Sequence, residues 1–292
     1  MKTIFDVVVC PVCSGALHPR DRSLVCEAGH TFDIASSGYV NLLPPGRKNN
    51  AVTGDRRDLV RARSAFLSTG LYDAVSDGAA DLVLSFIGDD PVFADFGCGE
   101  GYHTCRTADR VREKLGSVLA VGVDASKYAA EAGAKRAKRA GFSSFERSGD
   151  CSLSFVAGNF FTPPIADGSL SCVLSMFAPV AYDACRRTLR AGGALVVLYP
   201  GPDHLIELRR AIYPEVRREE RTLDAPPFLR EVDKKEIKYS ARLKSEEQLA
   251  DLLGMTPFFC RVPGSAKERV LSSGLREVTV DVTAAALISG KV

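Results

Sequence analysis

The chain has 292 residues, of which 46% are hydrophobic and 25% are charged. These values are typical of a globular protein and exclude a disordered chain, and the length predicts one sizeable domain with a smaller one. A formal net charge of +2 gives little overall support for a nucleic-acid partner. With no run of eighteen apolar residues and no apolar leader after Met1, we expect a cytoplasmic protein without a membrane span.

Four candidate metal ligands lie within the first thirty residues. Cys10 and Cys13 form one pair, and Cys26 and His30 follow after twelve further residues. Three thiolates and one imidazole suit the tetrahedral geometry of structural zinc. The alternative is that the cysteines are ordinary apolar residues, but the polar stretch between the pairs would bury thiols poorly without a metal. His18 lies between the pairs and precedes a proline, so His30 is the better fourth ligand.

The next elements are predicted to lead from this module into a larger domain. Residues 39–43 have the character of a strand or extended exit, and the breakers and charges of 44–50 predict a linker. A helix is expected up to Gly70, with Leu59, Ala62, Phe66 and Leu67 on one face, followed by a second helix to about Phe86. We therefore divide the chain into a zinc-binding domain, a linker with a helical segment, and a main domain, at residues 1–43, 44–75 and 76–292.

From residue 91, short apolar runs alternate with helical stretches, which is typical of a doubly wound parallel sheet. The expected parallel strands are Val92–Phe96, Val118–Val123, Leu153–Ala157, Ser171–Met176 and Ala194–Tyr199. Two later runs, Ile237–Leu243 and Leu275–Val282, are expected to pair antiparallel at one edge, with a helix starting after Ser245 between them. Residues 141–152 are expected to form a surface loop. The pattern predicts an α/β fold with the Rossmann-like sheet of class I methyltransferases: five parallel strands plus an antiparallel edge pair.

A glycine-rich loop follows the first of these strands. Asp95 ends the strand, and Gly97, Gly99 and Gly101 follow at alternate positions. Glycines at this spacing let the backbone turn tightly and let a ligand approach without meeting a Cβ. Such a loop lies at the carboxyl edge of the sheet, where open α/β folds bind ligands. The spacing is tighter than that of the dinucleotide fingerprint and favours S-adenosylmethionine.

Two further strand ends support a cofactor site. Asp124 ends the next strand, where its carboxylate can accept both ribose hydroxyls, and Asn159 follows the third strand, where an adenine contact is expected. The alternative is a domain that binds NAD, which uses a similar acid. An Asn/Asp-Pro-Pro-Tyr motif and a catalytic cysteine pair are both missing, which argues against methylation of an exocyclic amine or a pyrimidine carbon. A ring nitrogen is the remaining simple acceptor.

Basic residues cluster locally. Arg56, Arg57, Arg61 and Arg63 form one group, and further groups are Lys135, Arg136, Lys138 and Arg139, then Arg186, Arg187 and Arg190. Such groups on helices are more often solvated faces than phosphate contacts.

Taken together, these residues and motifs resemble the RlmA family, bacterial guanine-N1 methyltransferases of 23S rRNA that include macrolide-resistance members. The resemblance is nearly end to end. It is carried by the metal-ligand pairs and by the strings Gly38-Tyr39-Val40-Asn41-Leu42-Leu43-Pro44, Gly70-Leu71-Tyr72, Asp95-Phe96-Gly97-Cys98-Gly99-Glu100-Gly101-Tyr102, Phe177-Ala178-Pro179, Pro200-Gly201-Pro202-Asp203-His204 and Met255-Thr256-Pro257-Phe258.

The resemblance implies zinc at the four ligands above and cofactor contacts from Tyr72, Gly99, Glu100 and His204. It also implies a 23S rRNA hairpin as substrate and a homodimer that forms a shared RNA cleft. Tyr72 lies ahead of the sheet and is placed to act as a lid, and His204 follows the fifth strand at its carboxyl edge. For both, the alternative is a structural residue without a ligand.

Methyl transfer from S-adenosylmethionine to guanine N1 requires that the N1 proton be removed. Asp203, Asp183 and Asp55 are candidate bases by position. N1 is buried in a base pair, so the target is a loop base or one that is flipped out. The zinc domain is then expected to recognise RNA through residues such as Arg20, Arg22, Phe32 and Tyr39. Two alternatives stay open: a small-molecule methyltransferase with a zinc module, and a non-catalytic adaptor that binds zinc and the cofactor.

Overall fold

The computed structural model describes residues 2–44, 54–145, 151–218 and 220–290. From residue 45 onward, the predicted linker 44–50 lies outside the described residues, as does the middle of the predicted loop 141–152. Among the described residues, no helix combines the length and the apolar character that a membrane crossing needs.

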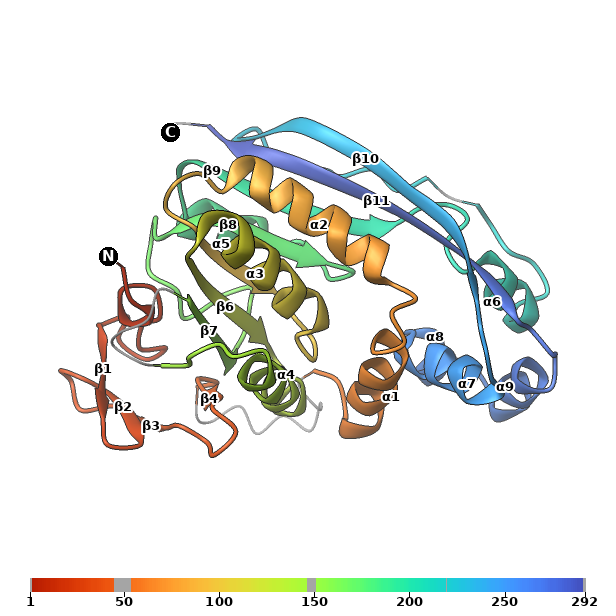
Figure 1. Cartoon of the computed structure of the whole chain (residues 1–292), viewed down its shortest axis with the longest axis horizontal. Coiled ribbons are helices and arrows are strands. Elements are labelled where there is room, and N and C mark those ends of the chain that lie inside the picture. Colours follow the sequence, from red (N-terminus) through yellow and green to blue (C-terminus); the bar gives the residue numbers. More distant parts are fainter. Residues whose placement is uncertain (1, 45–53, 146–150, 219, 291–292) are drawn as a thin grey trace.

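An eight-stranded sheet forms the centre of the molecule (Figure 1), in the order β10-β11-β9-β8-β5-β6-β7-β4. The strands are β4 (Val40–Asn41), β5 (Val92–Phe96), β6 (Val118–Asp124), β7 (Cys151–Ala157), β8 (Leu170–Met176), β9 (Leu189–Pro200), β10 (Leu229–Arg242) and β11 (Glu277–Ser289). The strands from β9 to β4 run parallel to their neighbours, β11 is antiparallel to β9, and β10 is antiparallel to β11. This confirms the predicted class I methyltransferase sheet with its antiparallel edge pair.

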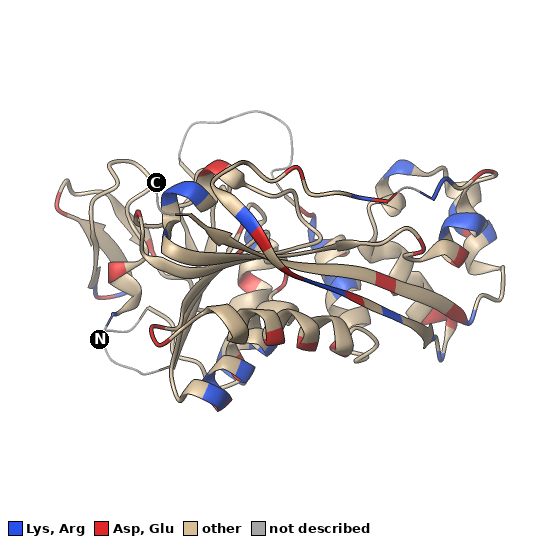
Figure 2. Ribbon diagram, turned by 90° about the horizontal axis from the view of Figure 1, so that it is seen from above, with Lys and Arg blue, Asp and Glu red and all other residues tan. Residues whose placement is uncertain are grey.

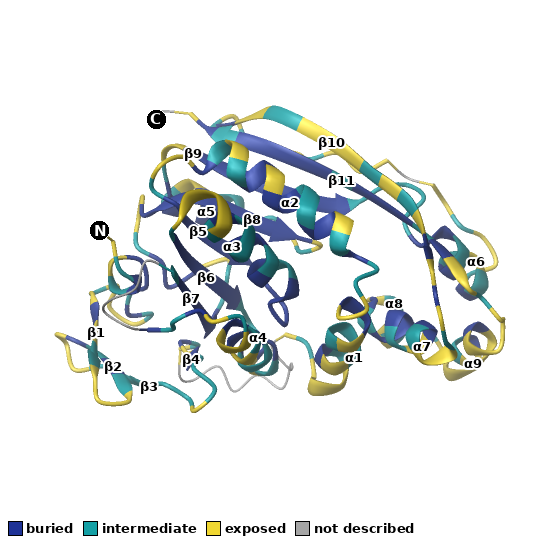
Figure 3. Ribbon diagram, in the orientation of Figure 1, coloured by how far each residue is buried: buried dark blue, intermediate teal, exposed yellow. Residues whose placement is uncertain are grey.

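Three features of the sheet differ from the sequence prediction. The exit of the N-terminal module is not merely extended: Val40 pairs with Val156, so β4 adds a sixth parallel strand at the edge. Strand β7 begins at Cys151, so the predicted loop 141–152 ends two residues early. The antiparallel hairpin is longer than predicted because β10 already begins at Leu229. Its outer strand is largely polar and exposed, as Figures 2 and 3 show, so an apolar pattern could not reveal the extra residues.

Helices cover one face of the sheet. The apolar side chains of α2 (Asp73–Phe86), α3 (Tyr102–Leu115) and α4 (Lys127–Arg139) share a core with the strand residues Phe93 and Leu153. The helix α1 (Arg57–Leu67) packs instead on α7 (Glu246–Met255), where a Cβ at Gly254 would lie 2.9 Å from the Cβ of Ala62. The remaining helices are α5 (Tyr182–Thr188), α6 (Ile206–Ile212), α8 (Phe258–Arg261) and α9 (Gly264–Leu271).

The N-terminal module covers part of the opposite face, together with α5 (Figure 1). The module consists of a short 3-10 helix (Ile4–Asp6) and the three-stranded sheet β1 (Leu17–Arg20), β2 (Ser23–Cys26) and β3 (Thr31–Asp33). Ile4, Val8 and Leu24 are buried in one cluster with sheet residues such as Phe96. The backbone amide of Val9 donates to the carbonyl of Pro164 at 3.0 Å. The module is thus part of the main core.

Close packing of α4 and the glycine loop on the sheet depends on Phe155 in β7. A Cβ at Gly101, Gly122 or Gly133 would come within 2.6 Å of its ring. Glycine at these three positions therefore lets the loop, β6 and α4 contact one fully buried aromatic side chain.

We predict that Phe155→Ala lowers the free energy of unfolding by about 3–5 kcal/mol, because it leaves a cavity at this junction. The measurement is denaturant unfolding. Phe161→Ala is the control, since Phe161 is 51% exposed and its loss should change stability little. Equal, small losses for both variants would contradict the packing role of Phe155.

Candidate active site and metal site

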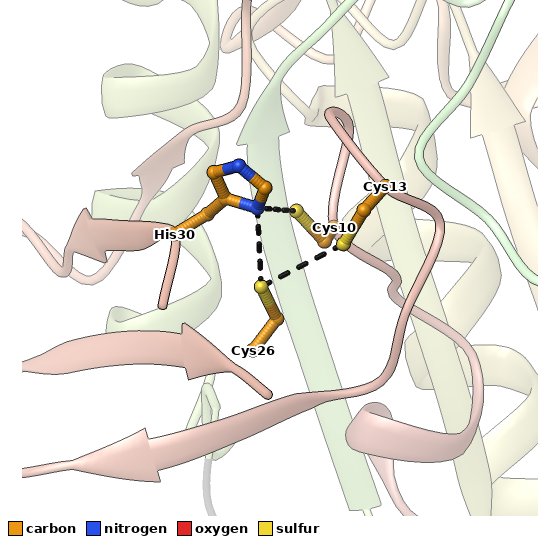
Figure 4. A group of neighbouring side chains, drawn as sticks. All are labelled: Cys10, Cys13, Cys26 and His30. Carbon is orange, nitrogen blue, oxygen red and sulfur yellow. Dashed lines mark hydrogen bonds between the residues drawn. The ribbon is translucent and has the colours of Figure 1, made fainter. Parts of the chain in front are cut away.

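Four side chains of the N-terminal module point toward one another (Figure 4). The Sγ atoms of Cys13 and Cys26 are 3.7 Å apart, and His30 Nδ1 lies 3.6 Å from Cys10 Sγ and 3.3 Å from Cys26 Sγ. A tetrahedral zinc ion needs S–S and S–N separations of about 3.8 and 3.5 Å, given its usual bond lengths. The set therefore has the size of a zinc site, as the spacing predicted. His18 is exposed on β1 and is not part of this group.

Two tight turns build this geometry. The carbonyl of Cys10 accepts from the amide of Ser14, and the carbonyl of Cys26 accepts from that of Gly29, which has a positive φ of 83°. Burial raises the pKa of the Cys26 thiol, but hydrogen bonds from His30 and the neighbouring thiols outweigh burial and lower it to about 6. A lowered pKa favours the thiolate that zinc binds.

We predict that Cys26→Ser reduces the zinc content of the purified protein from about one ion per chain toward zero and lowers its melting temperature, because one of the four ligands is removed. Metal analysis and calorimetry measure the two effects. Cys260→Ser is the matched control, since Cys260 is an exposed free thiol elsewhere in the chain. Full zinc content in the Cys26 variant would contradict this ligand set.

The glycine loop joins β5 to α3 at the carboxyl edge of the sheet. Gly97, Gly99 and Gly101 all have positive φ values, of 81°, 54° and 76°. The amide of Gly99 donates to Asp124 Oδ2 at 3.0 Å, and the amide of Ser126 donates to Asp124 Oδ1 at 2.8 Å. A Cβ at Gly97 would lie 2.7 Å from the Cβ of Ala178, which follows β8. The predicted loop and acid are therefore brought together.

One buried carboxyl group precedes this loop, and a second lies within it. Asp95 is 1% exposed, and its Oδ2 accepts a hydrogen bond from Thr104 Oγ1 at 2.5 Å. Glu100 is 2% exposed, and its Oε1 lies 3.7 Å from Arg136 Nη2. Burial raises the pKa of Glu100, while Arg136 and Arg63 oppose that rise. Glu100 Oε1 has no hydrogen-bond partner among the described residues, so a ligand with hydroxyl or amine donors would satisfy it.

Burial raises the pKa of Asp95 from 3.8 to about 7, with Thr104 opposing the rise and Asp124 and Glu100 adding to it. Because the folded-state pKa is the higher one, the stability contributed by neutral Asp95 is complete below pH 3.8 and is lost as the pH rises to about 7. We predict that Asp95→Asn, which stays neutral, gains about 1 kcal/mol or more relative to the wild type across this range. Unfolding at several pH values measures the difference, and a pH-independent difference would contradict it.

Tyr72 and His204 meet at the same edge. Tyr72 Oη lies 3.3 Å from His204 Nε2, and His204 Nδ1 accepts a hydrogen bond from the amide of Asp281 at 3.2 Å. Nδ1 is therefore unprotonated, and Nε2 carries the hydrogen that it donates to Tyr72. Burial lowers the pKa of His204 to about 4, so the ring is neutral at pH 7. Phe177, which the site prediction did not single out, stacks on His204 with ring centroids 5.7 Å apart and is 40% exposed.

The other predicted residues lie around this centre. Asn159 follows β7, and its Oδ1 accepts from the amide of Phe161 at 3.0 Å. Asp203 pairs with Lys238 and Arg218, both at 2.9 Å, and these cations lower the pKa of its carboxyl group. Asp55 pairs with Arg63 at 2.5 Å. Asp183 is exposed at the start of α5. Ion pairing with Lys238 and Arg218 makes Asp203 a weaker base than an isolated carboxylate.

Comparison with known proteins agrees with both parts of the chain. Residues 8–50 match the family model "RlmA, N-terminal", and residues 93–193 match "Methyltransferase domain". The 23S rRNA (guanine(748)-N(1))-methyltransferase of Streptomyces fradiae is 32% identical over 97% of this chain and 96% of its own. The chain belongs to the RlmA family.

Two further relatives have similar names. A putative 23S rRNA (guanine-N(1)-)-methyltransferase of Micromonospora griseorubida is 36% identical over 68% of this chain and 67% of its own. The putative 23S rRNA (guanine-N(1)-)-methyltransferase YxjB of Bacillus subtilis is 28% identical over 95% of each chain. This RlmA-family protein is therefore an S-adenosylmethionine-dependent methyltransferase with a zinc ribbon, as the sequence predicted.

Two arginines at this site were noted in the sequence only as members of basic groups. Arg63 of α1 lies over the loop, with its Nη1 3.5 Å from where a Cβ of Gly99 would be. Arg136 of α4 reaches Glu100 and also donates to Ser64 Oγ at 3.1 Å. Charge clustering was the only sequence signal, and it could not assign either side chain to the loop because both come from distant helices.

Proposed function

We propose that this RlmA-family methyltransferase transfers a methyl group from S-adenosylmethionine to N1 of a guanine in a hairpin loop of 23S rRNA. The observation that carries the proposal is the match to the Streptomyces fradiae relative, which extends over 97% of this chain and so includes both the zinc ribbon and the cofactor domain. A small-molecule methyltransferase would need only the second part.

The cofactor is proposed to lie against the backbone of Gly97, Gly99 and Gly101, whose positive φ values shape the loop at the carboxyl edge of the sheet. Asp124 and Glu100 would accept its hydroxyl and amine donors, and Asn159 would contact its adenine. Tyr72 and His204 would close the opposite side, because they lie at the same sheet edge. When bound, the cofactor supplies an electrophilic methyl group on a sulfonium ion.

Phe177 is the residue best placed to contact the target guanine. The rings of His204, Tyr72 and His103 lie around Phe177, whose side chain is still 40% exposed, and this exposed part is proposed to stack on an unpaired guanine. Stacking would fix the direction of N1 and promote methyl transfer by alignment.

His204 itself does not serve as the catalytic base, because its Nδ1 already accepts a hydrogen bond from the amide of Asp281 and its Nε2 carries a hydrogen. Among the three candidate bases, Asp183 is the one without an ion pair to a described residue.

The zinc site would be formed by Cys10, Cys13, Cys26 and His30, and the zinc ribbon is proposed to contact the RNA. Arg20 and Arg22 are exposed on the hairpin of β1 and β2 and are available to phosphates, whereas Phe32 and Tyr39 pack partly against the core. We also propose that the protein acts as a homodimer. Light scattering of the purified protein tests this part separately.

The function is tested with labelled S-adenosylmethionine and 23S rRNA from cells that lack this gene. We expect about one methyl group per rRNA and a reverse-transcription stop at a single guanine, because N1 methylation blocks the pairing edge. Phe177→Ala should reduce the rate at least about tenfold if stacking aligns the base. No incorporation by a protein that still binds the cofactor would overturn the proposal and favour a small-molecule acceptor. Deletion of residues 1–43 cannot distinguish an RNA substrate from a small-molecule substrate. It would expose the apolar residues of the central sheet that pack against the N-terminal module, so activity would be lost in either case.

A further inference from the structure

A groove of about 480 Å³ separates α1 from α4 on the surface of the protein. A second hollow of about 430 Å³ shares Glu131, Lys135 and Arg139 with it and extends to Ser36 and Ser37, in the turn between β3 and β4. Together they form one track, which we call the α1–α4 groove. Its basic lining residues are Arg57, Arg61, Lys135, Arg136, Lys138 and Arg139.

The groove is strongly basic, although the chain as a whole is nearly neutral. Six Lys and Arg residues line it, against one acidic residue, Glu131. Glu131 pairs with Lys135 at 2.6 Å, and Arg136 is engaged with Glu100 at 3.7 Å. The remaining four cations form no ion pair with any residue in the described part of the chain. A concentration of unpaired cations along one groove favours a polyanion as ligand.

Aromatic and hydroxyl groups accompany these charges. The Tyr128 ring lines the groove and lies between two cations, with Arg57 Cζ 4.9 Å and Lys127 Nζ 5.2 Å from its centroid. Ser36 and Ser37 supply hydroxyl groups at the far end. Phosphate contacts from Arg and Lys, combined with an aromatic platform for an unpaired base, are typical of surfaces that bind RNA. An acidic protein partner would have less use for a half-buried aromatic ring that lines the groove beside two cations.

The position of the groove connects it with the active site. Arg136 lies in the groove and also reaches Glu100 in the cofactor loop, while Ser64 of α1 accepts a hydrogen bond from Arg136 at 3.1 Å. At the other end, Ser36 and Ser37 belong to the N-terminal module that carries the zinc ligands. An RNA strand in the groove would therefore run from the zinc ribbon to the loop where the cofactor is expected.

We propose that the α1–α4 groove binds the sugar–phosphate backbone of the substrate RNA and guides it between the zinc ribbon and the active site. The identity of the RNA rests on the proposed function. The interactions are electrostatic and do not depend on sequence, so they contribute affinity and orientation, whereas the choice of base is made elsewhere.

The test uses the full chain and a labelled 23S rRNA hairpin transcript that contains the guanine position named for the Streptomyces fradiae relative. The variant combines Arg61→Gln, Lys138→Gln and Arg139→Gln, which removes three charges and keeps good helix formers. The matched control combines Arg230→Gln, Lys234→Gln and Lys235→Gln, three cations of β10 outside the groove. Dissociation constants are measured over a series of salt concentrations.

We expect the groove variant to bind the transcript at least about tenfold more weakly, because three cations no longer face the phosphates. The slope of log K against log salt should fall by roughly 2–3, close to one for each cation that is neutralised. The control should match the wild type, and cofactor affinity and melting temperature should be unchanged in both variants. A groove variant with the affinity and salt slope of the control would overturn the proposal. So would a wild-type protein that does not bind the transcript.

Binding and methylation are read separately, so the two proposals fail in different ways. If the wild type binds the transcript through the groove but methylates no guanine, the groove proposal stands and the proposed function fails. If the wild type methylates a guanine and the groove variant keeps the wild-type affinity, the function stands and the groove proposal fails.

Discussion

Burial of both faces of a parallel sheet is the constraint on which the rest of this structure depends. The central strands are apolar on both sides, so each face needs a cover. Helices α2, α3 and α4 cover one face, and on the other the N-terminal module packs beside α5. The module is thus a structural part of the enzyme, and its β4 strand completes the edge of the sheet. Metal binding in the module is thereby coupled to the stability of the domain that holds the cofactor.

The carboxyl edge of the sheet brings several buried carboxyl groups close together. Asp95 and Glu100 are almost fully buried there, and Asp124 accepts two backbone hydrogen bonds. Burial alone would favour their neutral forms, while Arg63 and Arg136 approach from α1 and α4 and favour the charged form of Glu100. Two helices from different parts of the chain therefore influence the charge of the loop.

The same two helices form the α1–α4 groove. Arg136 belongs both to the groove and to the surroundings of Glu100, so RNA and cofactor would meet at a shared side chain. On the other side of the loop, His204 stacks on Phe177 and leaves part of its ring exposed. RNA bound in the α1–α4 groove on one side of the loop, and a guanine stacked on Phe177 on the other, would bring the guanine to the loop where the cofactor is expected.

Local patterns in the sequence were enough to predict the zinc ligands, the glycine-rich loop and most of the central strands. The spacing of Cys10, Cys13, Cys26 and His30 implied a zinc site, and the alternate glycines after Asp95 implied a cofactor loop, because both signals lie within a few consecutive residues. The strand positions were also correct wherever both faces are buried, since an uninterrupted apolar run marks such strands.

Only the tertiary structure decided which distant segments meet. Nothing in the sequence placed the metal module on the sheet, because its apolar residues are compatible with a core of its own. The contacts of Arg63, Arg136 and Asp281 with the site join residues far apart in the chain, and a charge or an amide has no periodicity that reveals its partner. These contacts depend on how the helices and the N-terminal module pack on the sheet, so only the tertiary structure reveals them.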